Sequence, residues 1–311
     1  MKKLLFGIAI LLLLGYGWNA LKSMGSDENK IVVREGKLTG TGESGQRESM
    51  RANPESEQAM LEVAPDEVYR GNLLLVNSRH PVPKKAKLPD VVNLFEQPEL
   101  AEGIGIVDDS VELPPELLSR FTEMIKAAEA DGVDRFLITS GYRSVEKQAE
   151  LYDKMGADYA NPPGYSEHNL GLSLDVGSAL GLMKEAPEGK WLERNAWKHG
   201  FILRYPEHKT EITGVKHEPW HFRYVGLPHS AIMQKQDLVL EEYIDYLKNQ
   251  GRIQAEVDGI AYEVSYYAVK DKLPLSIPIS GNYAVSGNNM DGVIVTTWGG
   301  DSSDAKEAGP L

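Results

Sequence analysis

Cysteine is absent from the 311 residues of the sequence. This absence excludes disulfide bonds, zinc sites built from thiolates, a cysteine nucleophile and a lipid-modified cysteine. It does not fix the compartment, because many exported bacterial proteins also lack cysteine. Excess positive charge is lacking too, since the net charge is −13. An acidic surface repels phosphate backbones, so we expect no nucleic-acid partner.

Long apolar runs are scarce, and the one that stands out lies at the N-terminus. Lys2 and Lys3 precede an uncharged apolar run from Leu4 to Leu21. As a helix this run would span roughly 27 Å, close to the hydrocarbon thickness of a bilayer. We expect residues 1–23 to be a single-pass membrane anchor with the body of the protein on the extracytoplasmic side. A cleaved signal peptide begins in the same way, although no A-x-A-like cleavage site follows.

The rest of the chain divides by composition into four parts. Residues 24–66 are rich in Ser, Gly, Glu and Asn, which predicts a flexible linker. Residues 67–249 mix helical and strand patterns and form the expected main globular domain. Residues 250–300 read as short strands separated by turn residues, which predicts a small β-rich C-terminal domain. Residues 301–311 are expected to be a loose tail.

The fold class expected for residues 67–249 is α+β, with helices packed outside a small antiparallel sheet. A helix is predicted from Pro115, with apolar residues at helical spacing at Leu117, Leu118, Phe121, Met124, Ile125 and Ala128. One long helix is predicted over residues 230–249. Strands are predicted at residues 73–77, 135–139, 172–176, 201–205 and 220–225.

The sequence from His217 to His221 matches the zinc-binding pattern H-E-x-x-H. That motif works on a helix, where positions four apart share one face. Pro219 stands in its middle, and a helix interior resists proline. In the strand that the following residues predict, the two histidines would lie roughly 13 Å apart. We therefore set this motif aside.

A different set combines His221 with the earlier stretch around His168. Strand alternation points Asp175 towards a polar cavity, and a bend at Gly171 would let His168 face the same cavity. Two imidazoles and one carboxylate leave an open position on zinc, and Glu218 is close enough in sequence to serve as a base. A closed structural zinc site is the alternative, but it would want a fourth protein ligand.

The order and spacing of these residues resemble those of the VanY-type zinc D,D-carboxypeptidases. The matching motif positions are Ser166, His168, Gly171, Asp175, Glu218, Trp220 and His221. An upstream match comprises Ser140, Arg143 and Gln148. The resemblance covers about residues 68–249. The anchor and the β-rich tail resemble membrane-bound members found in glycopeptide-resistance clusters.

The resemblance implies a zinc cofactor held by His168, Asp175 and His221. It implies that Glu218 is the general base and that Arg143 stabilises the oxyanion. Gln148 and Ser166 become candidates for binding the substrate peptide. Plainer roles remain open, since Arg143 could cap a strand, Gln148 could be a solvated helix residue, and Ser166 could only orient His168. Trp220 is expected to pack behind His221.

The implied reaction removes the C-terminal D-Ala from peptidoglycan precursor stem peptides that end in D-Ala-D-Ala. Removal of that residue would deplete the target of vancomycin-type drugs. The scheme has no serine nucleophile, so penicillins should not inhibit. Two alternatives remain: an L,D-carboxypeptidase or D,D-dipeptidase of the same family, and a non-enzymatic wall-binding protein, against which the intact set of residues speaks.

Overall fold

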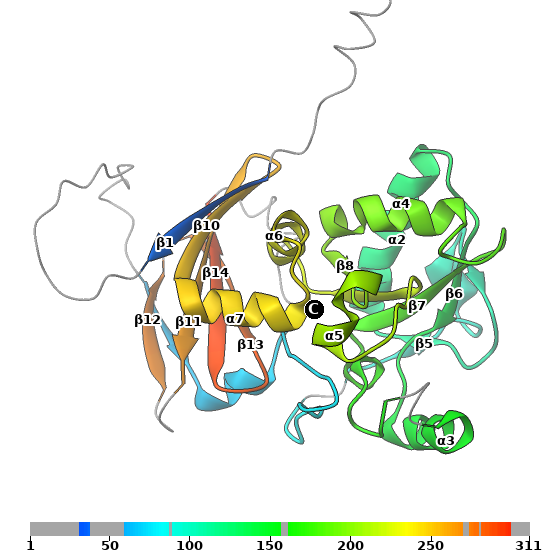
Figure 1. The fold of residues 1–311 in the computed structure, drawn as a ribbon, viewed down its shortest axis with the longest axis horizontal. Coiled ribbons are helices and arrows are strands. Elements are labelled where there is room, and N and C mark those ends of the chain that lie inside the picture. Colours follow the sequence, from blue (N-terminus) through cyan, green and yellow to red (C-terminus); the bar gives the residue numbers. More distant parts are fainter. Residues whose placement is uncertain are drawn as a thin grey trace, which may run out of the picture.

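Two five-stranded sheets, each with helices packed on it, dominate the part of the chain that the structure describes, and two two-stranded sheets accompany them (Figure 1). The computed structural model describes residues 31–37, 59–86, 89–156, 161–269, 274–279 and 281–299. The predicted anchor at residues 1–23 and the predicted tail at residues 301–311 lie outside these ranges. Within these ranges, no helix has both the length and the apolar character needed to cross a membrane.

The first sheet, here called the mixed sheet, carries the predicted metal ligands. Its strand order is β4 (Gly105–Ile106), β6 (Phe136–Ser140), β7 (Ser173–Ser178), β9 (His221–Tyr224) and β8 (Phe201–Leu203). All neighbouring pairs are antiparallel except β4 and β6, which are parallel. The predicted α+β class with a small antiparallel sheet is therefore confirmed, with one parallel pair at the edge.

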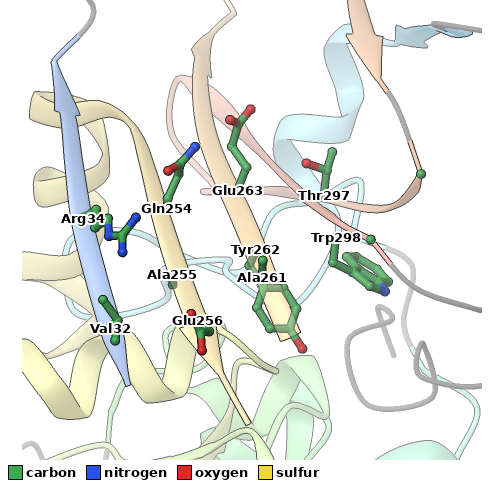
Figure 2. A pocket seen from close by; sticks show the side chains of 12 residues that line it. Val32, Arg34, Gln254, Ala255, Glu256, Ala261, Tyr262, Glu263, Thr297 and Trp298 are labelled. Atoms are coloured by element: carbon green, nitrogen blue, oxygen red, sulfur yellow. The ribbon is translucent and has the colours of Figure 1, made fainter. Parts of the chain in front are cut away.

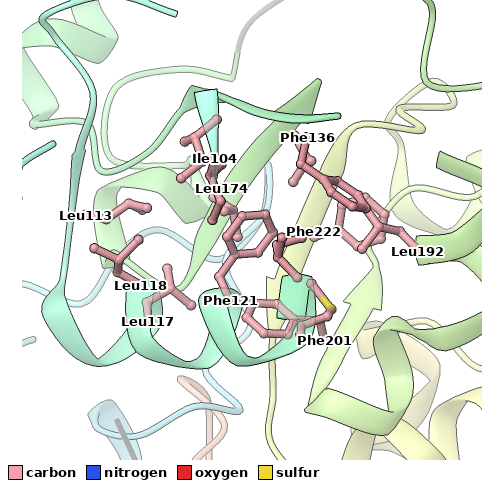
Figure 3. Close-up of a cluster of buried hydrophobic side chains, with 14 of the residues drawn as sticks. Ile104, Leu113, Leu117, Leu118, Phe121, Phe136, Leu174, Leu192, Phe201 and Phe222 are labelled. Atoms are coloured by element: carbon pink, nitrogen blue, oxygen red, sulfur yellow. The ribbon is translucent and has the colours of Figure 1, made fainter. Parts of the chain in front are cut away.

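The helix α2 (Pro115–Ala130) packs its apolar face against the mixed sheet (Figure 3). Its helical spacing brings Leu117, Phe121 and Ile125 into one buried cluster with Leu174 of β7 and Phe222 of β9. α4 (Pro187–Asn195) contributes to the same cluster. Burial of each such side chain contributes about 1.5–3 kcal/mol. This core fixes the strands on which the polar site is built.

The second sheet, here called the β-rich sheet, is fully antiparallel. Its strand order is β1 (Val32–Lys37), β10 (Gly251–Val257), β11 (Ile260–Ala268), β14 (Gly292–Trp298) and β13 (Asn282–Gly287). A two-stranded sheet of β2 (Ala59–Val63) and β12 (Leu275–Ile279) packs beside it through a shared apolar cluster. The flexible linker predicted for residues 24–66 is therefore wrong at β1 and β2. Both strands form because they find partners more than a domain's length away in the sequence.

The single helix predicted for residues 230–249 is two helices. α6 (His229–Gln236) ends at Asp237, which adopts a left-handed conformation with φ 51°, and α7 (Leu240–Gln250) begins three residues later. The hydrophobic face of α7 packs on the inner face of the β-rich sheet, with Ile244 and Ile253 in one cluster. α7 thereby joins the two halves of the molecule.

Residues 72–77, here called the connector, contain the strand predicted at residues 73–77, and this prediction is wrong. Apart from a single bridge between Asn77 and His80, the connector pairs with no strand. The amide of Leu73 donates to the Ser286 hydroxyl, and the Leu75 carbonyl accepts from the Asn289 side chain. Its buried backbone groups are satisfied by side chains and by isolated backbone contacts, such as that from the Leu75 amide to the Asn288 carbonyl, instead of by a ladder.

The remaining described elements are short or peripheral. They are β3 (Val92–Asn93), β5 (Glu112–Leu113), α3 (Val145–Met155), α5 (Thr210–Thr213), and the 3-10 helices η1 (Pro65–Tyr69), η2 (Pro98–Ala101), η3 (Glu167–Leu170), η4 (Ala196–His199) and η5 (Glu207–Lys209). Ser144 caps α3 by accepting a hydrogen bond from the Lys147 amide.

A pocket of about 460 Å³ lies on the β-rich sheet (Figure 2). Its lining includes Arg34 of β1, Gln254 and Glu256 of β10, Glu263 of β11 and Thr297 of β14. No histidine lines it. The residues that could hold a metal lie in the other half of the described chain.

Candidate metal centre

His168, Asp175 and His221 meet at the mixed sheet, and one potential ligand atom from each lies within 4.8 Å of the others. Asp175 Oδ1 lies 3.4 Å from His168 Nε2 and 3.1 Å from His221 Nδ1. In the described part of the chain, this is the group of His, Cys, Asp or Glu residues that could hold a metal ion. The three residues predicted as ligands are brought together by η3, β7 and β9.

The register of β7 against β9 places two of the ligands opposite each other. Asp175 is the direct antiparallel partner of His221, so their side chains emerge on the same face of the sheet. Leu174, the residue before Asp175, points the other way into the apolar core. Strand alternation thus separates the polar site from the core.

His168 reaches the same place from a short 3-10 helix that ends at a glycine. Ser166 caps η3 by accepting from the His168 amide, and Gly171 ends it in a left-handed conformation with φ 70°. A Cβ at this position would lie 2.6 Å from a side-chain atom of Pro89 and 2.9 Å from one of Pro114. Both the backbone conformation and the close approach require glycine. The predicted bend between His168 and Asp175 is present.

The donor set fits a metal ion. His168 Nδ1 lies 2.6 Å from the Gly141 carbonyl, which accepts its proton and leaves Nε2 unprotonated towards Asp175. Asp175 Oδ1 is buried and has no hydrogen-bond partner. Two imidazole nitrogens and one carboxylate oxygen are a ligand set used by catalytic zinc sites, which keep a further position open.

Glu167 supports His221 from behind, and the sequence reasoning gave it no role. Its Oε2 lies 3.4 Å from His221 Nε2, so it accepts the imidazole proton and leaves Nδ1 to face Asp175. Its Oε1 accepts from Arg204 at 2.8 Å and from Arg223 at 2.7 Å. Both Arg204 and Arg223 are fully buried, so neither is solvated, and both hold a carboxylate inside the fold. The available signal was Arg223, which follows His221 by two residues and so shares its face of the strand.

Electrostatics in the centre match a bound cation. Burial raises the pKa of Asp175, but its interactions with His168 and His221 outweigh burial and hold the pKa below its ordinary value. Burial lowers the pKa of His221, but its interactions with Asp175 and Glu167 outweigh burial and raise the pKa to about 9. The imidazole is thus surrounded by negative charge, the environment that also favours a divalent metal ion.

Glu218 lies at the edge of the cluster, with Oε2 3.7 Å from His221 Nδ1. The turn at Pro219 precedes β9, and the amide of Glu218 donates to the Tyr205 carbonyl, which fixes the turn. Burial raises the pKa of Glu218, and the charge of Asp175 adds to this, against the opposing effects of His221 and Arg143. A carboxylate with a raised pKa beside a metal site is suited to accept and return a proton.

Arg143 is held by the two residues predicted near it. Its Nη1 donates to Gln148 Oε1 at 2.8 Å and its Nη2 donates to Ser140 Oγ at 3.2 Å. Gln148 is buried and its amide also donates to the Asn161 carbonyl. Both polar atoms of Gln148 are therefore engaged within the protein. Ser166 is buried at the cap of η3, with its hydroxyl oxygen accepting from the His168 amide.

Several tempting residues lie outside the cluster. His217 is not in it: its Nδ1 lies 3.9 Å from Glu207 Oε2. The geometry of a helical H-E-x-x-H motif is absent, because His221 begins a strand. Trp220, expected to pack behind His221, is instead 41% exposed.

Comparison with known proteins adds a family. The family described as "VanY: D-alanyl-D-alanine carboxypeptidase" matches residues 110–227. A D-alanyl-D-alanine carboxypeptidase of Enterococcus faecium is 46% identical over 303 residues, which cover 97% of this chain and 98% of the relative. The bifunctional D-Ala-D-Ala dipeptidase and D-Ala-D-Ala carboxypeptidase VanXYC of Enterococcus gallinarum is 35% identical over 192 residues, covering 56% of this chain and 94% of the relative.

Among solved structures, the D,D-dipeptidase VanXYg in complex with a D-Ala-D-Ala phosphinate analogue is similar to this chain. The TM-score is 0.67 at 30% sequence identity, covering 78% of this chain and all of the other. A point mutant of the D,D-pentapeptidase VanY from a VanB-type resistance cassette, in complex with Zn(II), is 32% identical, with a TM-score of 0.47 over 56% of this chain and 98% of that chain.

Proposed function

Since the chain belongs to the VanY family of D-alanyl-D-alanine carboxypeptidases, we propose that it is a zinc-dependent D,D-carboxypeptidase. It removes the C-terminal D-Ala from peptidoglycan precursor peptides that end in D-Ala-D-Ala, and thereby contributes to resistance against vancomycin-type glycopeptides. The observation that carries the proposal is the His168, Asp175 and His221 cluster, with Glu218 at its edge, in a chain that matches a D-Ala-D-Ala carboxypeptidase over nearly its whole length.

The metal would be held by His168 Nε2, Asp175 Oδ1 and His221 Nδ1. When bound, zinc supplies Lewis acidity, which lowers the pKa of water towards neutrality and polarises a carbonyl group. The backbone carbonyl of Gly141 and the carboxylate of Glu167 orient the two imidazoles.

Glu218 would transfer the proton, and Arg143 would stabilise the negative charge that develops on the substrate oxygen. The Glu218 carboxylate takes a proton from the attacking water and returns it to the leaving amine of D-Ala. The Arg143 guanidinium has five N–H groups. One donates to Gln148 and one to Ser140, so N–H groups remain to donate to the developing oxyanion. Gln148 supports the reaction by holding Arg143, and Ser166 by capping the turn that carries His168.

Substrate specificity is tested by incubating the zinc-loaded protein with a pentapeptide, a tetrapeptide and free D-Ala-D-Ala, and identifying the products by mass. Release of D-Ala from the pentapeptide is the expected result. Cleavage of the tetrapeptide alone would identify an L,D-carboxypeptidase. Cleavage of free D-Ala-D-Ala alone would identify a D,D-dipeptidase, which the likeness to VanXYg makes the second candidate.

The ligand set is tested with His221→Ala. We expect this variant to lose stoichiometric zinc, measured by metal analysis after dialysis, because three protein ligands become two. Full zinc occupancy in the variant would refute the set.

Residues 1–23 are proposed to anchor the protein in the cell membrane with the catalytic domain outside. Support comes from the uncharged run between Leu4 and Leu21 and from the two lysines before it. Lipid-linked precursors are exposed on that side. Fractionation of cells that express the full chain or a chain without residues 1–23 tests this, and an equal soluble fraction for both would contradict an anchor.

A further inference from the structure

We propose that Glu167 is a positioning residue for the metal ligand His221, and that α7 holds Glu167 in place through Arg204. The β-rich half of the molecule would then be part of the metal centre's support. This inference rests on the proposed function, because it concerns the same metal site.

The first link joins the ligand to a buried carboxylate. Glu167 is 1% exposed, and its Oε2 lies 3.4 Å from His221 Nε2. A carboxylate on the far nitrogen of a ligating imidazole fixes its tautomer and the orientation of the ring. With a proton held on Nε2, His221 Nδ1, which lies 3.1 Å from Asp175 Oδ1, would be the nitrogen left for the metal.

The second link fixes the carboxylate itself. Glu167 Oε1 accepts from Arg204 Nε at 2.8 Å and from Arg223 Nη1 at 2.7 Å, which leaves Oε2 for His221. Both guanidinium groups are 0% exposed. Water cannot replace a missing partner here, so the carboxylate has one orientation in which all groups are satisfied.

The third link leads out of the mixed sheet into the β-rich half. Arg204 donates its Nη1 and Nη2 to the two carboxylate oxygens of Glu241, at 2.9 and 2.8 Å. Glu241 lies in the first turn of α7, whose other face packs on the β-rich sheet. Asn77 of the connector donates to the same carboxylate at 3.1 Å.

A parallel route passes through Arg223. Its Nη2 donates to the Asn72 and Leu74 carbonyls of the connector, at 2.8 and 3.0 Å. Between these two residues, the Leu73 amide donates to Ser286 at the end of β13. Both arginines that hold Glu167 are therefore held in turn by elements packed on the β-rich sheet.

The energetic cost of this network argues for a positioning role. Buried ion pairs are seldom more stabilising than well-packed apolar residues of similar volume, because each charge loses its hydration. Burying Arg204, Arg223, Glu167 and Glu241 together therefore adds little stability over apolar packing. They do provide a rigid acceptor for one imidazole proton, and outer partners of this kind typically change metal affinity 10–100-fold.

The experiment compares Glu167→Gln and Glu241→Gln with the matched control Asp245→Asn in the full-length protein. Asp245 is exposed on the same helix, one turn after Glu241, so its variant removes the same charge without touching the network. Zinc affinity is measured by competition with a chelator, without substrate. We expect the zinc dissociation constant to rise about 10–100-fold for Glu167→Gln, several-fold for Glu241→Gln, and not for the control.

The double variant decides whether the two residues act together. If Glu167 and Glu241 belong to one network, their combined effect on zinc affinity will be smaller than the product of the single effects. Unchanged zinc affinity in Glu167→Gln would overturn the positioning role, and multiplicative effects would overturn the link to α7. Should Glu167→Gln fail to fold, equal affinities for Glu241→Gln and Asp245→Asn would overturn the link on their own.

The zinc titration also separates this inference from the proposed function. A wild-type protein that binds zinc but releases no D-Ala would refute the carboxypeptidase activity while leaving the network to be judged by affinity. At saturating zinc, we further expect Glu241→Gln to lower kcat with little change in KM, because a misaligned ligand affects the reaction more than peptide binding. A change confined to KM would contradict positioning.

Discussion

The mixed sheet and the β-rich sheet each have five strands, but they place polar groups in opposite ways. Every residue of β9 in the mixed sheet is buried, including His221 and Arg223. Along β10 of the β-rich sheet, exposed and buried residues alternate, with Gln254 and Glu256 outward and Ile253 inward. One sheet buries charge and must compensate each charge inside the protein. The other keeps its charges at the surface and buries apolar side chains together with a few hydroxyl groups, those of Ser265, Ser286 and Thr296.

This difference predicts how each half responds to substitution. In the mixed sheet, a change of one polar atom leaves a buried group unpaired or removes a reacting group, so activity is the sensitive property. In the β-rich sheet, a change of volume creates a cavity, so stability is the sensitive property. The following substitutions test that division, from the largest expected effect to the smallest.

Glu218→Gln should lower kcat by about 10³-fold or more, because the amide cannot accept the proton of the attacking water. Zinc content and the unfolding temperature should stay as in the wild type, since Glu218 is not among the ligands. Release of D-Ala from pentapeptide measures the effect. Glu211→Gln, an exposed residue of α5, is the control. Turnover near the wild-type rate would remove Glu218 from the role of base.

Arg143→Lys should lower kcat/KM by about 10²–10³-fold, or roughly 3 kcal/mol of activation free energy. Lysine keeps the charge but cannot donate to Gln148, Ser140 and an oxyanion from one planar group. Steady-state kinetics at saturating zinc measure this loss. If the variant kept more than a tenth of the activity, the fixed guanidinium geometry would have little importance.

His229 offers a test at the junction of the two halves. It bridges Tyr243 of α7 and Thr296 of β14, and burial lowers its pKa from 6.5 to about 3. Between pH 3 and pH 6.5, His229 is therefore protonated in the unfolded chain and neutral in the folded protein. The stabilisation from a neutral His229 is complete above pH 6.5 and is lost as the pH falls towards 3, at up to about 1.4 kcal/mol per pH unit.

The measurement is the free energy of urea unfolding of the zinc-free protein between pH 7 and the acid limit of solubility. His229→Gln should show a shallower dependence on pH than the wild type, because glutamine has no proton to take up. His208→Gln serves as the control, since His208 is mostly exposed. Parallel curves for the wild type and His229→Gln would show that His229 titrates normally.

Ile253→Val should have the smallest effect, lowering the free energy of unfolding by about 1 kcal/mol through the loss of one buried methylene. Ile253 lies between α7 and the β-rich sheet, away from the polar network. The turnover number of the folded, zinc-loaded enzyme should stay within about twofold of the wild type. A larger loss of turnover at unchanged stability would mean that the two halves do not divide activity and stability as described.

Much of the mixed sheet was predictable because its signals are local. The helical spacing of α2, the alternation in β7 and the fixed intervals between His168, Gly171 and Asp175 all lie within short windows of sequence. His221 was placed correctly because Pro219 and the residues after it exclude a helix. The candidate ligand group could therefore be assembled before any long-range contact was known.

The features that were missed depend on distant partners. β1 lies in a polar stretch and becomes a strand only by pairing with β10. The connector looks apolar enough for a strand, but side chains from both halves take its backbone groups. Nothing in the sequence before Asp237 breaks a helix, and the break follows from its left-handed conformation. The proposed role of Glu167 depends on Arg204, which directly follows β8, and on Arg223 of β9, and neither lies near it in the sequence.

The position of β1 also governs when the molecule can finish folding. Its partner β10 begins at Gly251, and the partner of β2 begins at Leu275. Contacts between such distant segments form late, because a very long loop must close first. Until β10 to β14 are available, α7 lacks the surface on which it packs. A nascent chain halted before residue 250 should thus remain open to proteases at residues 32–37. The protein's own carboxypeptidase activity would begin only once synthesis of the last strands is complete.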